Sequence, residues 1–154
     1  MSRTKLKTIN EKMKNFILYS SPLKENAQSA TLLLFRVAFA ILLILHGWQK
    51  IQSYSVLSSV FPDPVGLGPQ LSLTLAIGAE FFAGLFVIAG FLTRLALIPM
   101  IFTMGVAFFV THAADAFQVK ELAFVYMVAF VILFITGPGK FSVDNVIFKP
   151  SSQK

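Results

Sequence analysis

The chain contains no cysteine, which excludes disulfide bonds, thiol redox chemistry and thiolate metal sites. Charged residues are also scarce, at 13% of 154 residues, whereas 56% are hydrophobic and the mean hydropathy is +0.75. Soluble domains usually carry about 25% charged residues, so this composition excludes an ordinary soluble domain. The sequence therefore indicates a single integral membrane domain, and any redox role would need a bound cofactor or a partner protein.

Four apolar runs are long enough to cross a bilayer, which requires about 20 mainly apolar residues per helix. They cover residues 31–51, 71–92, 95–113 and 121–136. Only Thr93 and Arg94 separate the second run from the third, so these two form a tight antiparallel hairpin with its turn at the membrane surface. We expect an all-α fold, a four-helix transmembrane bundle with a short N-terminal amphipathic helix.

The basic residues are distributed unevenly around these runs. Most precede the first run, lie between the second and third, or follow the fourth: Arg3, Lys5, Lys7, Lys12, Lys14, Lys24, Arg94, Lys140, Lys149 and Lys154. Because basic residues near membrane spans stay on the cytoplasmic side, both termini are expected in the cytoplasm, with loops 51–70 and 114–120 facing outward. The net charge of +6 comes from these tails and predicts contact with lipid headgroups rather than nucleic acid.

Three regions follow from this pattern. Residues 1–29 form a cytoplasmic basic arm, residues 30–147 the membrane domain, and residues 148–154 a cytoplasmic tail. Within the arm, residues 4–18 place apolar and basic side chains on opposite arcs, which is typical of an interfacial amphipathic helix, and a disordered basic arm is the alternative.

Ionisable residues occur on all four predicted spans. At 100° per residue, Arg36, His46 and Lys50 share one stripe of the first span, and Glu80 lies inside the second. A charged residue inside a membrane costs on the order of 2.5–3.5 kcal/mol, so it normally faces the bundle interior and a partner. The depths of Arg36 and Glu80 differ by roughly 8 Å by this arithmetic, which predicts a structural ion pair between them.

The same arithmetic predicts an outward-facing polar pocket between the helices. Its expected ligand-binding residues are His46, Lys50, Glu80, His112 and Glu121, of which Glu80, His46 and Lys50 are candidates for a catalytic role. Snorkelling at the span ends is the alternative explanation for the histidines and lysines. The two histidines with Asp115 or Glu121 could also ligate haem or a metal, but the ligand set has no redundancy, so no metal site is predicted.

The order of these motifs resembles the DoxX family of small bacterial four-helix integral membrane proteins. The segments that carry the resemblance are LLLFRVAFAILLILHGWQKI, FPDPVGLG, AEFFAGLFVIAGFLTRLALIP, HAADAFQVKELAFVY and GPGKFSVD, which together cover about residues 30–147. The resemblance implies polar positions at Arg36, His46, Lys50, Glu80, Arg94, His112, Glu121 and Asp144. It also implies a link to quinol oxidases, to thiosulfate:quinone oxidoreductase or to oxidative-stress complexes, while most family members have no demonstrated activity.

Together these inferences predict a multi-pass protein of the bacterial inner membrane, associated with quinone-linked oxidoreduction. The pocket would bind a quinone headgroup or a small anionic substrate, with Lys50 and His46 hydrogen-bonding it and Glu80 relaying a proton. Alternatives are a small-solute transporter and a non-catalytic membrane scaffold for a redox or stress-response complex. The expected partners are the lipid bilayer and redox-enzyme subunits. Whether the chain is itself an enzyme, and whether it forms a homo-oligomer, stay open.

Overall fold

The computed structural model describes Lys5, Lys7, Met13 and residues 23–148. The amphipathic helix predicted over residues 4–18 lies outside these residues, apart from three isolated positions. Every regular element in the described part of the chain is a helix. In chain order they are α2 (Glu25–Gln52), α3 (Tyr54–Val60), α4 (Pro69–Ile77), η1 (Gly78–Phe82), α5 (Ala83–Ala89), α6 (Thr93–Val106), η2 (Ala107–Thr111), α7 (Phe117–Thr136) and α8 (Val143–Phe148).

Four of these helical runs are long and apolar enough to span a membrane. They are Glu25–Gln52, Pro69–Ala89, Thr93–Thr111 and Phe117–Thr136, where the second joins α4, η1 and α5 and the third joins α6 and η2. The predicted all-α fold with four transmembrane helices is therefore confirmed. The first helix begins earlier than expected, at Glu25 instead of Thr31.

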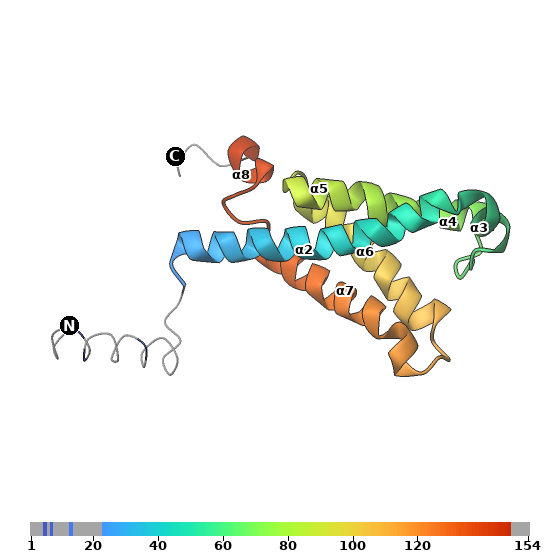
Figure 1. Cartoon of the computed structure of the whole chain (residues 1–154). Helices are drawn as coiled ribbons and strands as arrows, with labels where there is room; N and C mark the ends of the chain where they lie inside the picture. The colour runs from blue at the N-terminus through green and yellow to red at the C-terminus, as the bar shows by residue number, and fades with distance from the viewer. Residues whose placement is uncertain (1–4, 6, 8–12, 14–22, 149–154) are drawn as a thin grey trace.

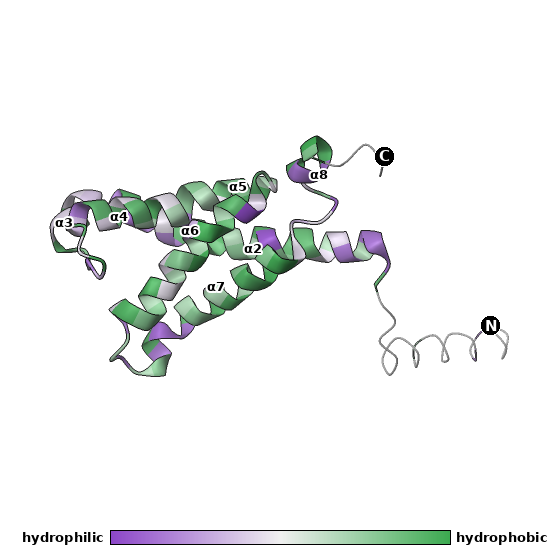
Figure 2. Cartoon of the chain, turned by 180° about the vertical axis from the view of Figure 1, so that it is seen from behind, coloured by the Kyte–Doolittle hydropathy of each residue, from purple (hydrophilic) through white to green (hydrophobic). Residues whose placement is uncertain are grey.

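The bundle has two distinct ends (Figure 1). At the terminal end lie the start of α2, the α5–α6 turn, the end of α7 and the short helix α8. At the loop end lie α3, the loop of residues 61–68 and the turn of residues 112–116. In both views α6 and α7 diverge from α2 and α4 towards the loop end, and Figure 2 shows hydrophobic residues along the spans with hydrophilic residues mainly near their ends.

The tight core lies where α2, α5, α6 and α7 meet. Its fully buried apolar side chains include Leu43, Val87, Leu97, Met100, Phe130 and Leu133. Large apolar side chains on the outside, such as Leu34 and Ile135, are mostly exposed, as expected for helices that face lipid. Each span therefore buries only the side chains on the face that meets the other helices, and the rest of its apolar surface faces the bilayer.

The hairpin between the second and third spans turns earlier than predicted. The turn is formed by residues 90–92, and Thr93 and Arg94 already belong to α6. Gly90 adopts a left-handed conformation with φ +68°, which ends α5, and Leu92 is also left-handed with φ 45°. The carboxylate of Asp144 accepts hydrogen bonds from the backbone N–H groups of Leu92 at 2.7 Å and Thr93 at 2.9 Å, so the C-terminal segment caps this turn.

Arg36 holds the same C-terminal segment against the terminal end. Its side chain is 2% exposed and donates to the backbone carbonyls of Pro138 and Phe141, each at 2.6 Å. A Cβ on Gly90 would lie 2.8 Å from the guanidinium carbon of Arg36, so the head of this side chain lies at the α5–α6 turn, ten residues along the chain from Glu80. The predicted ion pair between Arg36 and Glu80 is therefore wrong: Arg36 binds main-chain carbonyls and Glu80 has another partner.

Candidate functional site

The partner of Glu80 is Lys50. The ammonium nitrogen of Lys50 lies 2.6 Å from a carboxylate oxygen of Glu80, and the two side chains are 23% and 5% exposed. Lys50 belongs to the last turn of α2, so it is drawn inward by this pair and does not snorkel to the membrane surface. Gly47 allows the contact, because a Cβ there would lie 2.8 Å from the backbone nitrogen of Phe81 and 3.1 Å from Cβ of Glu80.

Two π-helical turns lie at the site. Glu80 is the middle residue of η1, and η2 forms the last five residues of the third span. A π-helical turn inserts one extra residue into a helix, is uncommon in proteins and occurs often at functional sites. Both turns contribute lining residues to one cavity: Ala79 and Glu80 come from η1, and Ala107 and Thr111 come from η2.

This cavity has a volume of about 590 Å³ and lies between α4–η1 on one side and α6–η2 on the other, beneath residues 61–67. Its polar lining residues are Lys50, Ser72, Glu80, Thr103, Thr111 and His112. The remaining lining is apolar and includes Phe61, Val65, Leu75, Phe102 and Met104. A volume within about 300–1,000 Å³, apolar walls and a few convergent polar groups are typical of small-molecule binding sites.

The loop that covers the cavity is held by Asp63. Its carboxylate accepts hydrogen bonds from the backbone N–H groups of Leu67 at 2.9 Å and Gly68 at 2.7 Å, and from the hydroxyl of Ser72 at 2.7 Å. The hydrogen bond from Ser72, and after it the one from Gly68, hold the pKa of Asp63 below its usual value. Asp63 was not among the residues predicted for the site. Its position within a loop rich in Pro and Gly is the only sequence signal of this turn-forming role.

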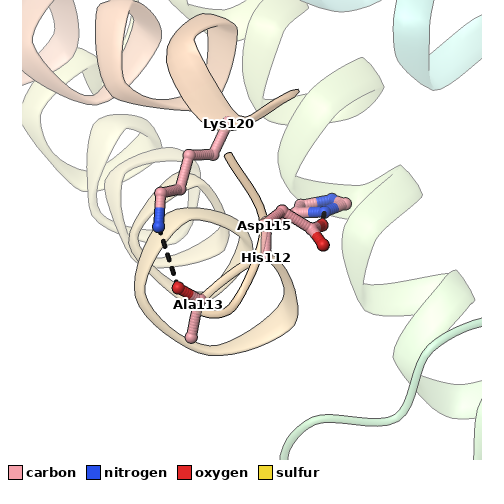
Figure 3. A network of polar contacts seen from close by, with 4 residues as sticks. All are labelled: His112, Ala113, Asp115 and Lys120. Carbon is pink, nitrogen blue, oxygen red and sulfur yellow. Dashed lines mark hydrogen bonds and ion pairs between the residues drawn. The ribbon is translucent and has the colours of Figure 1, made fainter. Parts of the chain in front are cut away.

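The third ionisable lining residue, His112, lies at the loop end of the cavity. Its Nδ1 is 2.7 Å from a carboxylate oxygen of Asp115 (Figure 3). In the same turn the ammonium of Lys120 donates to the carbonyl of Ala113 at 2.9 Å and lies 5.4 Å from the ring centre of Phe108. These contacts fix the turn of residues 112–116. The described residues contain no group of three or more His, Cys, Asp or Glu side chains placed to hold a metal ion.

Of the five residues predicted to line one pocket, the structure brings Lys50, Glu80 and His112 to this cavity. His46 and Glu121 are not among its lining residues. The ring of His46 lies edge-on to that of Tyr126, with ring centres 6.1 Å apart, and Glu121 is exposed near the start of α7. His46 is four residues from Lys50, but its ring contacts α7, whereas Lys50 reaches η1.

Comparison with known proteins places this architecture in a family. The family model described as DoxX matches residues 31–113. The inner membrane protein YqjF of Escherichia coli (strain K12) is 37% identical over 122 residues, covering 76% of this chain and 92% of that protein. The chain belongs to the DoxX family.

Two further relatives of this DoxX-family protein are less similar. The inner membrane protein YphA of Escherichia coli (strain K12) is 29% identical over 128 residues, covering 77% of this chain and 91% of that protein. An uncharacterised protein of Haemophilus influenzae is 29% identical over 110 residues, covering 68% of this chain and 73% of that protein. No solved structure matches the chain significantly.

Family membership and four apolar helices make the chain a multi-pass inner membrane protein. All lining residues of the cavity fall between Lys50 and His112, within the matched range 31–113. The cavity therefore belongs to the part of the chain that carries the family resemblance, whereas α7 and the C-terminal clamp lie beyond it.

Proposed function

We propose that this DoxX-family protein binds a lipid-soluble quinone in the cavity and acts as a membrane subunit in quinone-linked oxidoreduction. The observation that carries the proposal is a largely apolar cavity in which a buried glutamate paired with a half-buried lysine supplies the central polar group. A quinone combines an apolar body with two carbonyl oxygens that accept hydrogen bonds. The ammonium of Lys50 has donors left after it binds Glu80, and the ring of His112 supplies another polar contact.

The charge of the site favours a neutral headgroup. Lys50 and Glu80 form one positive and one negative charge 2.6 Å apart, so the pair carries no net charge. A small anion bound near Lys50 would also lie near the carboxylate of Glu80, which costs energy because the site is desolvated. The quinone is therefore favoured over the small anionic substrate that the sequence left open.

The terminal half of the bundle favours a binding site over a transport path. On the side of the cavity that faces the terminal end, Leu97 and Met100 of α6 are fully buried in the core. At the terminal end, Arg36 fastens residues 138–141 against α2. A solute carrier would need a polar route through this region, so the packing supports retention of a ligand in the outer half.

A redox partner completes the proposal. The chain has no cysteine, so electrons would pass between the bound quinone and the redox group of a partner oxidoreductase. In this role Lys50 and His112 orient the headgroup, and Glu80 holds the ammonium in place and accepts or returns a proton.

Quinone content of the purified protein tests the proposal. The wild type, extracted from native membranes into lipid nanodiscs, should retain quinone, measured by mass spectrometry against empty nanodiscs. His112→Gln should lower the retained amount several-fold, whereas His46→Gln should retain the wild-type amount, because only His112 lines the cavity. Thermal unfolding of each variant separates loss of ligand from loss of fold. Quinone content equal to that of empty nanodiscs in the folded wild type would refute the proposal.

A further inference from the structure

We infer that the ligand enters the cavity sideways from the bilayer, between α4 and α6, and leaves an apolar chain in that opening. The inference rests on the proposed function and specifies its ligand: a molecule with a small neutral headgroup and a single apolar chain. It follows from the packing around the cavity, the depth of the ion pair and the fastening of the loop at the loop end.

The opening lies where two helices separate. α5 packs closely against α6 in the terminal half of the bundle, whereas α4 and α6 have few direct contacts, and the cavity occupies the space between them. Leu75 of α4 and Phe102 of α6 both line the cavity and are 53% and 63% exposed. A residue that is both lining and exposed lies at an edge of the cavity. Since both residues belong to membrane spans, this edge faces lipid.

The aqueous end is a second edge of the cavity, because Val65 and Leu67 of the loop line the cavity and are each 49% exposed. This edge carries a fixed loop: the hydrogen bonds of Asp63 fasten residues 61–67 to the start of α4. A ligand that arrived from water would have to pass this fastened loop. A ligand dissolved in the bilayer meets the apolar edge at Leu75 and Phe102 directly.

The depth of the polar groups supports the same route. Glu80 lies ten residues before Gly90, and Thr103 lies ten residues after Thr93, so both are about 15 Å from the α5–α6 turn along their helices. This is about half the thickness of a hydrocarbon core of roughly 30 Å. A headgroup at this depth must be neutral and small, because a phospholipid headgroup would have to leave the membrane surface.

The length of the cavity favours a chain beside the headgroup. Its lining on the third span extends from Pro99 to His112, which corresponds to about 20 Å along a helix. Along the third span, the polar lining residues begin at Thr103 and continue towards the loop end, whereas the lining from Pro99 to Phe102 is apolar. A headgroup at Lys50 and Glu80 would therefore direct its chain towards Phe102 and out to lipid.

Reversible closure of the opening tests this route. Because the chain has no cysteine, Leu75→Cys with Phe102→Cys introduces a unique thiol pair that a bis-methanethiosulfonate reagent can bridge and a reductant can release. The probe is a benzoquinone with a long isoprenoid chain, added to nanodiscs that hold ligand-free protein. Bridging should slow its binding at least tenfold, and reduction should restore the rate. The control pair, Leu85→Cys with Ile98→Cys, lies at one level of the packed helices α5 and α6, is lipid-exposed and does not line the cavity.

The outcomes separate this inference from the proposed function. If the bridged and reduced forms bind the quinone equally fast, while His112→Gln still lowers binding several-fold, lateral entry is refuted and the quinone site stands. If no variant, nor the wild type, binds the quinone, the proposed function fails and the inference fails with it. If a long-chain fatty acid binds in preference to the quinone, the neutral headgroup is refuted.

Discussion

The Lys50–Glu80 ion pair predicts strongly coupled effects of substitution on stability. Lys50→Met would leave the 5% exposed carboxylate of Glu80 without its partner. Removing one member of a buried pair costs about 3–5 kcal/mol. Glu80→Gln should cost less, about 2 kcal/mol, because it weakens one charge-assisted hydrogen bond and the 23% exposed ammonium of Lys50 can still approach water.

The double variant, Lys50→Met with Glu80→Gln, removes both charges, so no charge is left without its partner. We therefore expect it to lose roughly 2–4 kcal/mol less than the sum of the two single losses. Arg36→Met combined with Glu80→Gln supplies the control. Arg36 and Lys50 are fourteen residues apart, about 21 Å along α2, so these losses should add within about 0.5 kcal/mol.

Thermal unfolding in one detergent, followed by circular dichroism, measures all of these variants. For a chain of about this length, 1 kcal/mol corresponds to roughly 2–4 °C in the unfolding midpoint. Additive losses for Lys50→Met and Glu80→Gln would refute the ion pair. A strong coupling between Arg36 and Glu80 would instead revive the pairing that the sequence suggested.

Three further predictions address the packing, the loop and the topology. Gly47→Ala should lower the free energy of unfolding by about 1–3 kcal/mol, because the added Cβ meets the backbone of Phe81. Gly78→Ala, whose Cβ would have no atom within 4 Å, should leave it unchanged or raise it by up to about 1 kcal/mol. Equal thermal unfolding midpoints for the two variants would contradict this prediction. The pKa of Asp63 is lowered in the folded protein, so its stabilisation of loop 61–68 is present above the usual value near 4 and is lost as pH falls through the lower folded pKa. Amide hydrogen exchange in this loop should therefore differ between Asp63→Asn and wild type at pH 6, and should become equal once the carboxyl of Asp63 is protonated. A difference that does not change with pH would contradict this prediction. Reporter fusions at the C-terminus should report cytoplasm and those within residues 61–67 the outer side, while a reversed pattern would place the cavity in the inner half.

The architecture was predictable because membrane spans depend on length and hydrophobicity, which a sequence displays directly. The four runs and the family were both evident from the residues. The assembly of Lys50, Glu80 and His112 at one cavity also followed from the rule that ionisable side chains in spans face the interior.

The choice of partners was not predictable, for two physical reasons. The predicted pair assumed that the side chain of Arg36 reaches towards Glu80 in the second span, whereas it extends to the α5–α6 turn and the C-terminal segment. A uniform 100° per residue also misses the π-helical turns, each of which inserts one residue and rotates the positions that follow. Neither the carbonyls that bind Arg36 nor the loop contacts of Asp63 appear in a helical projection, because they belong to irregular backbone.

The two cations of α2, buried Arg36 and half-buried Lys50, bind different kinds of partner. Arg36 binds carbonyls of the main chain, whose positions are fixed by the segment that they belong to, so this contact can only fasten the terminal end. Lys50 binds a side chain, and its flexible stem lets the ammonium share its donors between Glu80 and a third group without unfolding any backbone. The cavity reaches Lys50 and does not reach Arg36. The fold therefore places its adjustable ion pair beside the cavity and uses main-chain contacts to fasten the opposite end.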